Sequence, residues 1–230
     1  MSEIRVTSIV GENGGDRVGL TTGLTVGPLT GTTGIGATIS HQGHAQFAGV
    51  CTATSFSGSG ANLTNIPVPT GGIVQVKNTT LTSAYSDNTN SGAIWSFNND
   101  LLRVTITASS ASNFFLITGQ VVIGSNGLAV NSMLYDNNSA VTTAGALGDA
   151  ASSRRRSLSG GDSGNTEGVF TIPIHVYISC ADTNEHKFHY AFYHNAGSQQ
   201  YIHLNRSNSD SDTNKRGRYI SNITVMEIKG

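Results

Sequence analysis

The chain has 230 residues, of which 28 are Gly and only 4 are Pro, and this excludes a collagen repeat and a Pro-rich disordered chain. Charged residues make up 12% of the sequence, about half the usual share of a globular domain, so long charged surface helices are not expected. The formal net charge of -1 provides no global field toward nucleic acid, and no apolar run approaches the roughly 20 residues that span a bilayer.

The N-terminus lacks the basic start and apolar core of a secretory signal. We therefore expect a protein that is made in a cytoplasm. Cys51 and Cys180 lie far apart in the sequence, and we expect both to be reduced, partly buried thiols without a metal or cofactor.

Residues 18–66 contain no Asp, Glu, Lys or Arg and consist of short alternating stretches separated by Gly. Such a segment has too little apolar mass to form its own core, because small chains bury too small a fraction of their surface. Three copies wrapped around one axis would solve this problem. Residues 29–70 are therefore predicted to form an intertwined trimeric β shaft, and the alternative is a flexible Gly/Thr-rich linker. The apolar residues expected in the trimer core are Ile39, Phe47, Val50 and Phe56.

Residues 71–230 follow a Pro- and Gly-containing junction at 66–72 and contain about eight stretches with strand character. They are predicted to form a β-sandwich or jelly-roll domain, so the whole chain is expected to be all-β. Pro173 indicates an edge strand or a bulge. Asx- and Gly-rich clusters predict the turns between strands. The predicted strands are 73–77, 101–107, 114–123, 129–135, 169–179, 187–194, 201–205 and 220–229, and the predicted turns include 86–88, 136–138, 160–162 and 207–214.

Short segments separated by one or two residues lie in the middle of the chain at Gly36–Ser40, Gly43–Val50, Thr52–Gly60 and Leu63–Ile66, and two more lie near the start at Ile4–Val6 and Gly23–Val26. These segments resemble tail-fibre and other structural proteins of marine bacteriophages, cyanophages especially. The C-terminal part is similar to a phage fibre head module in Leu102–Thr107, Pro173–His175, Asn205–Asp210 and Ile223–Ile228.

The resemblance implies a non-enzymatic, homotrimeric virion appendage with its N-terminus toward the particle. On this basis residues 1–28 are expected to attach the protein to other tail or baseplate proteins, and the 71–230 head to bind a host surface glycan or outer-membrane receptor. The protein would then be made in the host cytoplasm and act on the virion. The alternatives are a capsid decoration or head-fibre protein without receptor binding and a small glycan-depolymerising enzyme.

His41 and His44 would place six imidazoles near a trimer axis, enough for an octahedral metal ion. However, their i, i+3 spacing across a Gly is more typical of a polar turn than of one strand face. We therefore expect no metal there. The second histidine group, at 186, 189 and 194, is expected to be surface or aromatic packing.

Arg154, Arg155 and Arg156 form the densest run of charge and are the candidate contact to anionic surface glycans. The alternative is an ion pair with a neighbouring subunit or a solvated strand. The basic segment 215–218 has the same two interpretations. No broad basic surface with stacking aromatics is present, so nucleic acid is not an expected partner.

Three other residue patterns are weaker indications of a binding or catalytic site. Residues 208–214 resemble a Ca²⁺ loop only vaguely, and a solvated Asx-rich turn is the preferred interpretation. The carboxylate pairs Asp162 with Glu167 and Asp182 with Glu185 could serve a glycosidase only if they faced each other across a cleft. Aromatic rings that could stack on sugars are Trp95, Tyr85, Tyr135, Tyr193 and Tyr201.

Overall fold

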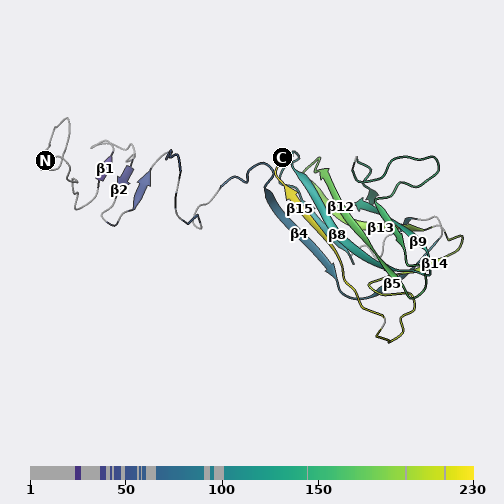
Figure 1. The fold of residues 1–230 in the computed structure, drawn as a ribbon. Coiled ribbons are helices and arrows are strands. Elements are labelled where there is room, and N and C mark those ends of the chain that lie inside the picture. Colours follow the sequence, from purple (N-terminus) through teal and green to yellow (C-terminus); the bar gives the residue numbers. More distant parts are fainter. Residues whose placement is uncertain are drawn as a thin grey trace, which may run out of the picture. The chain divides into compact units, whose positions relative to one another are not determined.

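The computed structural model describes residues 24–26, 37–39, 42, 44–47, 50–55, 57, 59–60, 66–90, 94–95, 101–143, 145–194, 196–214 and 216–230. Within these ranges every regular element is a β-strand (Figure 1). None of the described residues forms a helix with the length and apolar character needed to cross a membrane.

The chain divides into two units, Met1–Thr64 and Asn65–Gly230. In the first unit, β1 (Leu24–Val26), β2 (Ala37–Ile39) and β3 (Ala45–Phe47) form an antiparallel sheet in the order β1-β2-β3. All three residues of β3 are exposed, on both faces of the strand. At β3, therefore, neither face of this small sheet is buried against another part of the described chain.

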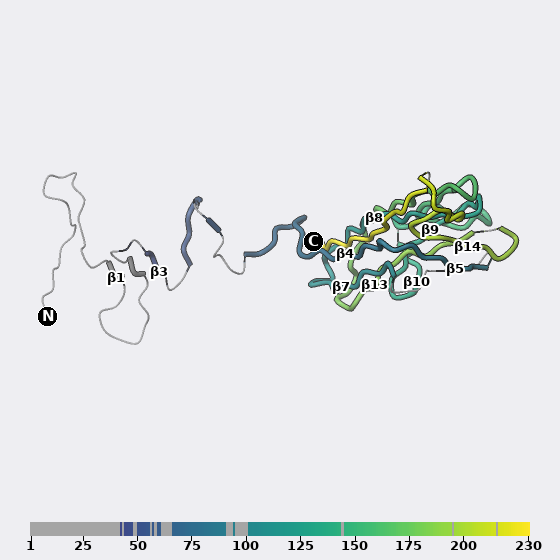
Figure 2. The backbone as a smooth tube through the Cα atoms, turned by 90° about the horizontal axis from the view of Figure 1, so that it is seen from below, coloured from purple at the N-terminus to yellow at the C-terminus, as the bar shows by residue number. Residues whose placement is uncertain are grey.

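The second unit contains two six-stranded antiparallel sheets. The first, named here the β8 sheet, has the order β4-β15-β8-β14-β5, and β12 pairs with the other edge of β8. Strands β4 and β15, which are far apart in sequence, run side by side (Figures 1 and 2). The bounds are β4 (Ile73–Leu81), β5 (Tyr85–Thr89), β8 (Phe114–Gly124), β12 (Val169–Ser179), β14 (Gln200–Leu204) and β15 (Ser221–Ile228).

The second sheet, named here the β13 sheet, has the order β10-β9-β13-β6. Strand β11 pairs with β9, and β7 pairs with β13, so each short strand shares an edge of a long central one. The bounds are β6 (Ile94–Trp95), β7 (Arg103–Thr107), β9 (Ala129–Asp136), β10 (Ser139–Ala140), β11 (Ser159–Asp162) and β13 (Glu185–His194).

Alternation of inward and outward side chains along the strands forms the core between these two sheets. From Thr171 to the end of β12 and throughout β15, buried residues alternate with exposed or half-buried ones. Phe115 of β8 packs edge-on against Phe188 of β13, with ring centroids 5.3 Å apart. Side chains from both sheets thus form one apolar layer, as expected for a sandwich.

The sequence-based prediction of an all-β chain with a β-sandwich is confirmed. Strand β12 pairs along its whole length with β8 and with no other strand of the described chain, so Pro173 lies at a sheet edge as expected. Asn137 and Asn138 have φ of 47° and 67° and form the predicted turn between β9 and β10. Two predicted turns are wrong. Residues 86–88 belong to β5 and 160–162 to β11, because each polar segment pairs with a neighbouring strand.

Glu227 is a fully buried carboxylate at the end of β15. It accepts hydrogen bonds from the Ser109 backbone N–H and hydroxyl, Asn113 Nδ2 and Gln75 Nε2, at 2.5–2.7 Å. Burial alone would raise the pKa of Glu227, but these hydrogen bonds outweigh it and lower the pKa from 4.5 to about 2. The charged carboxylate therefore ties the 107–113 loop to β4 and β15.

Replacing Glu227 by Gln should lower the free energy of unfolding by roughly 1–3 kcal/mol at pH 7, because an amide N–H₂ would face donors that need an acceptor. A depressed carboxyl pKa contributes stability that is complete above pH 4.5 and is lost as the pH falls toward 2. The difference between wild type and Glu227→Gln in urea unfolding should therefore narrow over this pH range. Equal stability of the two proteins at pH 7 would contradict this account.

Candidate functional site

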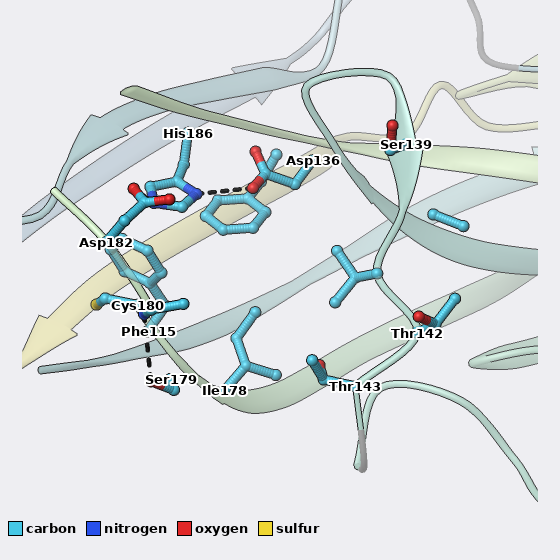
Figure 3. A pocket seen from close by; sticks show the side chains of 14 residues that line it. Phe115, Asp136, Ser139, Thr142, Thr143, Ile178, Ser179, Cys180, Asp182 and His186 are labelled. Carbon is cyan, nitrogen blue, oxygen red and sulfur yellow. Dashed lines mark hydrogen bonds and ion pairs between the residues drawn. The ribbon is translucent and has the colours of Figure 1, made fainter. Parts of the chain in front are cut away.

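A pocket of about 340 Å³ opens at one end of the sandwich (Figure 3). Its walls come from the start of β8, the β9–β10 turn, the 141–143 segment and the β12–β13 loop. The lining combines apolar side chains with hydroxyls and two carboxylates. The lining residues include Phe115, Asp136, Ser139, Cys180, Asp182 and His186.

His186 is the centre of the pocket's polar groups. Its Nδ1 lies 2.7 Å from Asp136 Oδ2, and its Nε2 lies 3.4 Å from Asp182 Oδ1. Only the first contact has hydrogen-bond geometry, so the buried Nε2 has no hydrogen-bond partner. The ring is packed edge-on against Phe115 and stacked on Phe188. The imidazole is thereby held between two carboxylates and two aromatic rings.

Local backbone structure places both carboxylates. Phe188 pairs with Asp136 in the β9–β13 ladder, and Asp136 Oδ1 also accepts the Lys187 backbone N–H at 2.8 Å. Asp182 lies in a tight loop after β12, where Ala181 has a φ of 62°. The backbone N–H of Asn184 donates to Asp182 at 2.7 Å and, as the main cause, holds the pKa of that carboxyl below its ordinary value.

Cys180 lies beside this cluster but is not an activated thiol. Burial, together with the charges of Glu227 and Asp182, raises the pKa of Cys180 to about 12. A thiol of this kind remains protonated and is a poor nucleophile. Both cysteines are free, and Cys51 is exposed rather than partly buried as expected.

The pocket's geometry is that of a hydrogen-bonding cluster. Both nitrogens of His186 face carboxylates, and neither is directed at a hydroxyl or thiol as a general base would be. Among the described residues no group of three or more His, Cys, Asp or Glu side chains is arranged to hold a metal ion. The two carboxylates and the absence of Lys or Arg from the lining favour neutral or cationic groups over anions.

The candidate glycan contact Arg154, Arg155 and Arg156 lies in an exposed loop between β10 and β11, not on a strand. The Arg155 guanidinium stacks over the Tyr193 ring at 4.2 Å, and Arg156 Nε donates to the Gly148 carbonyl at 2.6 Å. The loop therefore lies over the outer face of the β13 sheet. It combines three cations with one aromatic ring.

This loop and the pocket are well separated along β13. His186 and Tyr193 are seven residues apart on one strand, which corresponds to roughly 23 Å at 3.3 Å per residue. The pocket lies at the end where the chain enters the sandwich, because Ile73 pairs with Ile228, Ile228 with Phe114, and Phe114 with Ser179. Tyr193 lies toward the opposite end.

The basic segment near residue 216 is engaged in ion pairs within the chain. Arg216 lies 2.5 Å from Glu167, and Arg218 lies 2.7 Å from Asp210. The hydrogen bond from Arg218 is the main cause that lowers the pKa of Asp210. These contacts fit the structural interpretation of 208–218 rather than a calcium loop or a free basic patch.

The carboxylates of the two candidate catalytic pairs are engaged in other contacts. Glu185 lies 2.7 Å from Lys187 Nζ, and Asp162 accepts the backbone N–H of Gly164 at 2.7 Å. Glu167 turns to Arg216, as described above. Asp182 instead shares His186 with Asp136, 46 residues earlier in the chain, a combination that sequence spacing does not reveal.

The N-terminal candidates are described only in part. His41 and Phe56 lie outside the described residues, as do most of residues 1–28, and for Ile39 only the backbone strand is described. His44 is exposed, and so are Phe47 at 48% and Val50 at 93%. The trimer core and the metal expectation for this segment therefore stay predictions.

The histidines at 186, 189 and 194 are buried, with aromatic packing at two of them. His186 packs against Phe115 and Phe188, and His189 lies 5.7 Å from Tyr135. Desolvation is the main cause that lowers the pKa of His189. The expectation of aromatic packing is thus met at these two positions, and the surface alternative is wrong.

No protein-family model and no curated protein matches this sequence. Solved structures with similarity include infectious bursal disease virus Gx strain, at 15% identity and a TM-score of 0.31, covering 69% of this chain and 33% of the other. The Gt strain has 10% identity, a TM-score of 0.34 and coverage of 87% and 46%. The VP2 subviral particle of the same virus has 10% identity, a TM-score of 0.32 and coverage of 69% and 42%.

This chain spans less than half the length of those viral chains. TM-scores near 0.3 are too low to establish a common fold. These similarities therefore carry no argument about the function of this chain.

Asp136→Asn should lower the free energy of unfolding by about 1–3 kcal/mol, because it weakens two short, charge-assisted hydrogen bonds, to His186 and to the Lys187 backbone. Asp182→Asn is the matched control. Its side chain is 49% exposed and its contact with His186 is 3.4 Å, so this substitution should lower the free energy of unfolding less than Asp136→Asn does. Chemical denaturation of both variants measures the difference. Equal effects would contradict a central role for the Asp136–His186 contact.

Proposed function

We propose that this protein is a homotrimeric virion appendage of the tail-fibre kind, which adsorbs the virion to the host cell surface through its C-terminal sandwich. The observation that carries this proposal is the contrast between the two units. The sandwich buries its own apolar residues, whereas the described side chains of the N-terminal unit are exposed.

The exposed apolar residues of the N-terminal segment support assembly with other copies. Phe47, Val50 and Ile66 are 48%, 93% and 63% exposed in the single chain. Burying a large apolar side chain is worth roughly 1.5–3 kcal/mol, so identical neighbours would stabilise this segment if they covered these side chains. The resemblance to phage fibre segments falls on the same residues, 36–66, and supports the same arrangement.

The opposite end of the sandwich is the part proposed to meet the host. If residues 1–70 are attached to the particle, the end where the chain enters at Ile73 points inward. The pocket around His186 shares that inner end, whereas the Arg155–Tyr193 contact lies roughly 23 Å away along β13. We therefore assign receptor contact to the 154–156 loop rather than to the pocket.

The chemistry of this loop suits an anionic glycan. Guanidinium groups form paired hydrogen bonds to carboxylates and phosphates, and an aromatic ring offers a flat apolar face to a sugar. Repetition on three chains would strengthen a weak single contact through avidity.

In solution the full-length chain should have a mass of about 72 kDa, three times the 24.0 kDa of one chain. Light scattering coupled to size exclusion measures this directly. Phe47→Ser should promote dissociation because it removes an apolar ring from the proposed shared core, and Ala45→Ser is the matched control on the same strand. A mass of 24 kDa for the wild type would refute the trimer.

Arg154→Gln combined with Arg155→Gln should reduce binding of the full-length protein to host cells by about tenfold or more, since each lost charge-assisted contact is worth more than 1 kcal/mol. Arg218→Gln is the control, because that side chain is exposed but pairs with Asp210. Binding should also weaken as salt is added. Absence of any cell binding by the wild type would favour the capsid decoration alternative. Loss of polymeric host glycan on incubation with the protein would favour the glycan-depolymerising enzyme.

A further inference from the structure

The outer face of the β8 sheet carries four rows of side chains that run across β4, β15, β8 and β12. The ladder registers fix these rows, because residues paired across strands point to the same face. Ile73 is assigned to the first row by its pairing with Ile228, which lies across a β-bulge between Glu227 and Ile228. In Figure 1 the four strands lie next to one another in this order. The rows are Ile73–Ile228–Phe114–Ser179, Val76–Met226–Leu116–Tyr177, Asn78–Thr224–Thr118–His175 and Thr80–Asn222–Gln120–Pro173.

The first two rows form an apolar strip at the end where the chain enters the sandwich. Ile73, Val76 and Tyr177 are each at least 50% exposed. Phe114 and Tyr177 stack with ring centroids 4.9 Å apart and an interplanar angle of 13°. Seven of the eight positions in these rows are apolar or aromatic, so the strip is continuous across four strands. Exposed patches of this kind typically mark interaction sites.

The other two rows continue the face with uncharged polar groups. Asn78 Nδ2 donates to Thr224 Oγ1 at 2.7 Å, and Thr80 Oγ1 donates to Asn78 Oδ1 at 3.1 Å. None of the sixteen positions in the four rows is Asp, Glu, Lys or Arg. The sixteen residues are named here the uncharged face. Depletion of charge is the compositional feature of the centre of a protein interface.

We propose that the uncharged face contacts a second copy of this chain. This inference rests on the proposed function, and it assigns the contact between sandwiches that the trimer requires. A second copy presents surface of the same kind and leaves no charge desolvated without a partner. Anionic glycans or nucleic acid would find no cation on this face.

The course of the chain also favours a second copy as the occupant. Strand β4 begins at Ile73, directly after the 66–72 segment that leads from the N-terminal unit. If residues 29–70 hold three copies together, the starts of β4 in those copies are brought close, and the apolar rows lie at that start. Ile66, in the segment that precedes β4, is also an exposed apolar side chain, at 63%.

The size of the face is suitable for one part of an interface. Four strands at about 4.8 Å and eight residues at about 3.3 Å cover roughly 500 Å² in projection. A stable interface buries about 800 Å² on each partner, so the face would supply much of that area and residues 29–70 the remainder.

Cross-linking of the full-length chain tests the proposal. In a Cys51→Ser background, Val76→Cys and Tyr177→Cys would place thiols on the two edge strands of the face, three strand spacings or about 14 Å apart. A bismaleimide shorter than that distance cannot join them within one chain. Ile94→Cys with Glu185→Cys, two exposed positions on the β13 sheet, is the matched control.

We expect at least five times more covalently linked dimer and trimer from the Val76 and Tyr177 pair than from the control pair. If the protein is a trimer by mass but the Val76 and Tyr177 pair cross-links no better than the control pair, this inference is overturned and the proposed trimer is retained. That outcome includes the case in which residues 1–64 of the same chain cover the face. A mass of 24 kDa would overturn both proposals, and a cross-linked 48 kDa dimer would support the face but refute the trimer.

Discussion

The second unit depends on one interaction, the burial of the apolar inner faces of the β8 and β13 sheets against each other. Alternation along the strands places side chains such as Phe115, Ile172 and Ile223 inward, and the residues next to them in sequence face outward. The Phe115–Phe188 contact joins the sheets at one end. Glu227 shows how strong this constraint is, because a carboxylate on the inner face accepts four hydrogen bonds, from Gln75 of β4 and from Ser109 and Asn113 of the 107–113 loop. The N-terminal unit lacks an equivalent pair of faces.

Alternation also explains what could be predicted from the sequence. Strands β7, β12 and β15 were predicted within two residues because their apolar residues recur at every second position. Strand β5, Tyr-Ser-Asp-Asn-Thr, was predicted as a turn because its residues are typical of turns, and only its pairing with β14 makes it a strand. Local sequence cannot report a partner more than a hundred residues away.

The same reason applies to the candidate site. Asp136 and His186 are 50 residues apart and meet because β9 pairs with β13, so no short motif records them. The Arg154–Arg156 run was visible as a cluster of charge, but its stacking on Tyr193 depends on how the β10–β11 loop lies over the sheet. Sequence therefore indicates which groups are available, and topology decides which of them are neighbours.

The two sheets of the sandwich present outer surfaces of opposite character. The Arg155 guanidinium stacks on Tyr193 of the β13 sheet, within an exposed loop of three arginines, whereas the outer side of the β8 sheet has no Asp, Glu, Lys or Arg in its four cross-strand rows. Coulomb attraction is screened by dissolved ions, but burial of apolar surface is not weakened in this way. If the receptor contact and the subunit contact are as proposed, rising ionic strength would release the protein from a charged cell envelope while the subunits stay together, so attachment would be reversible and assembly durable within one small domain.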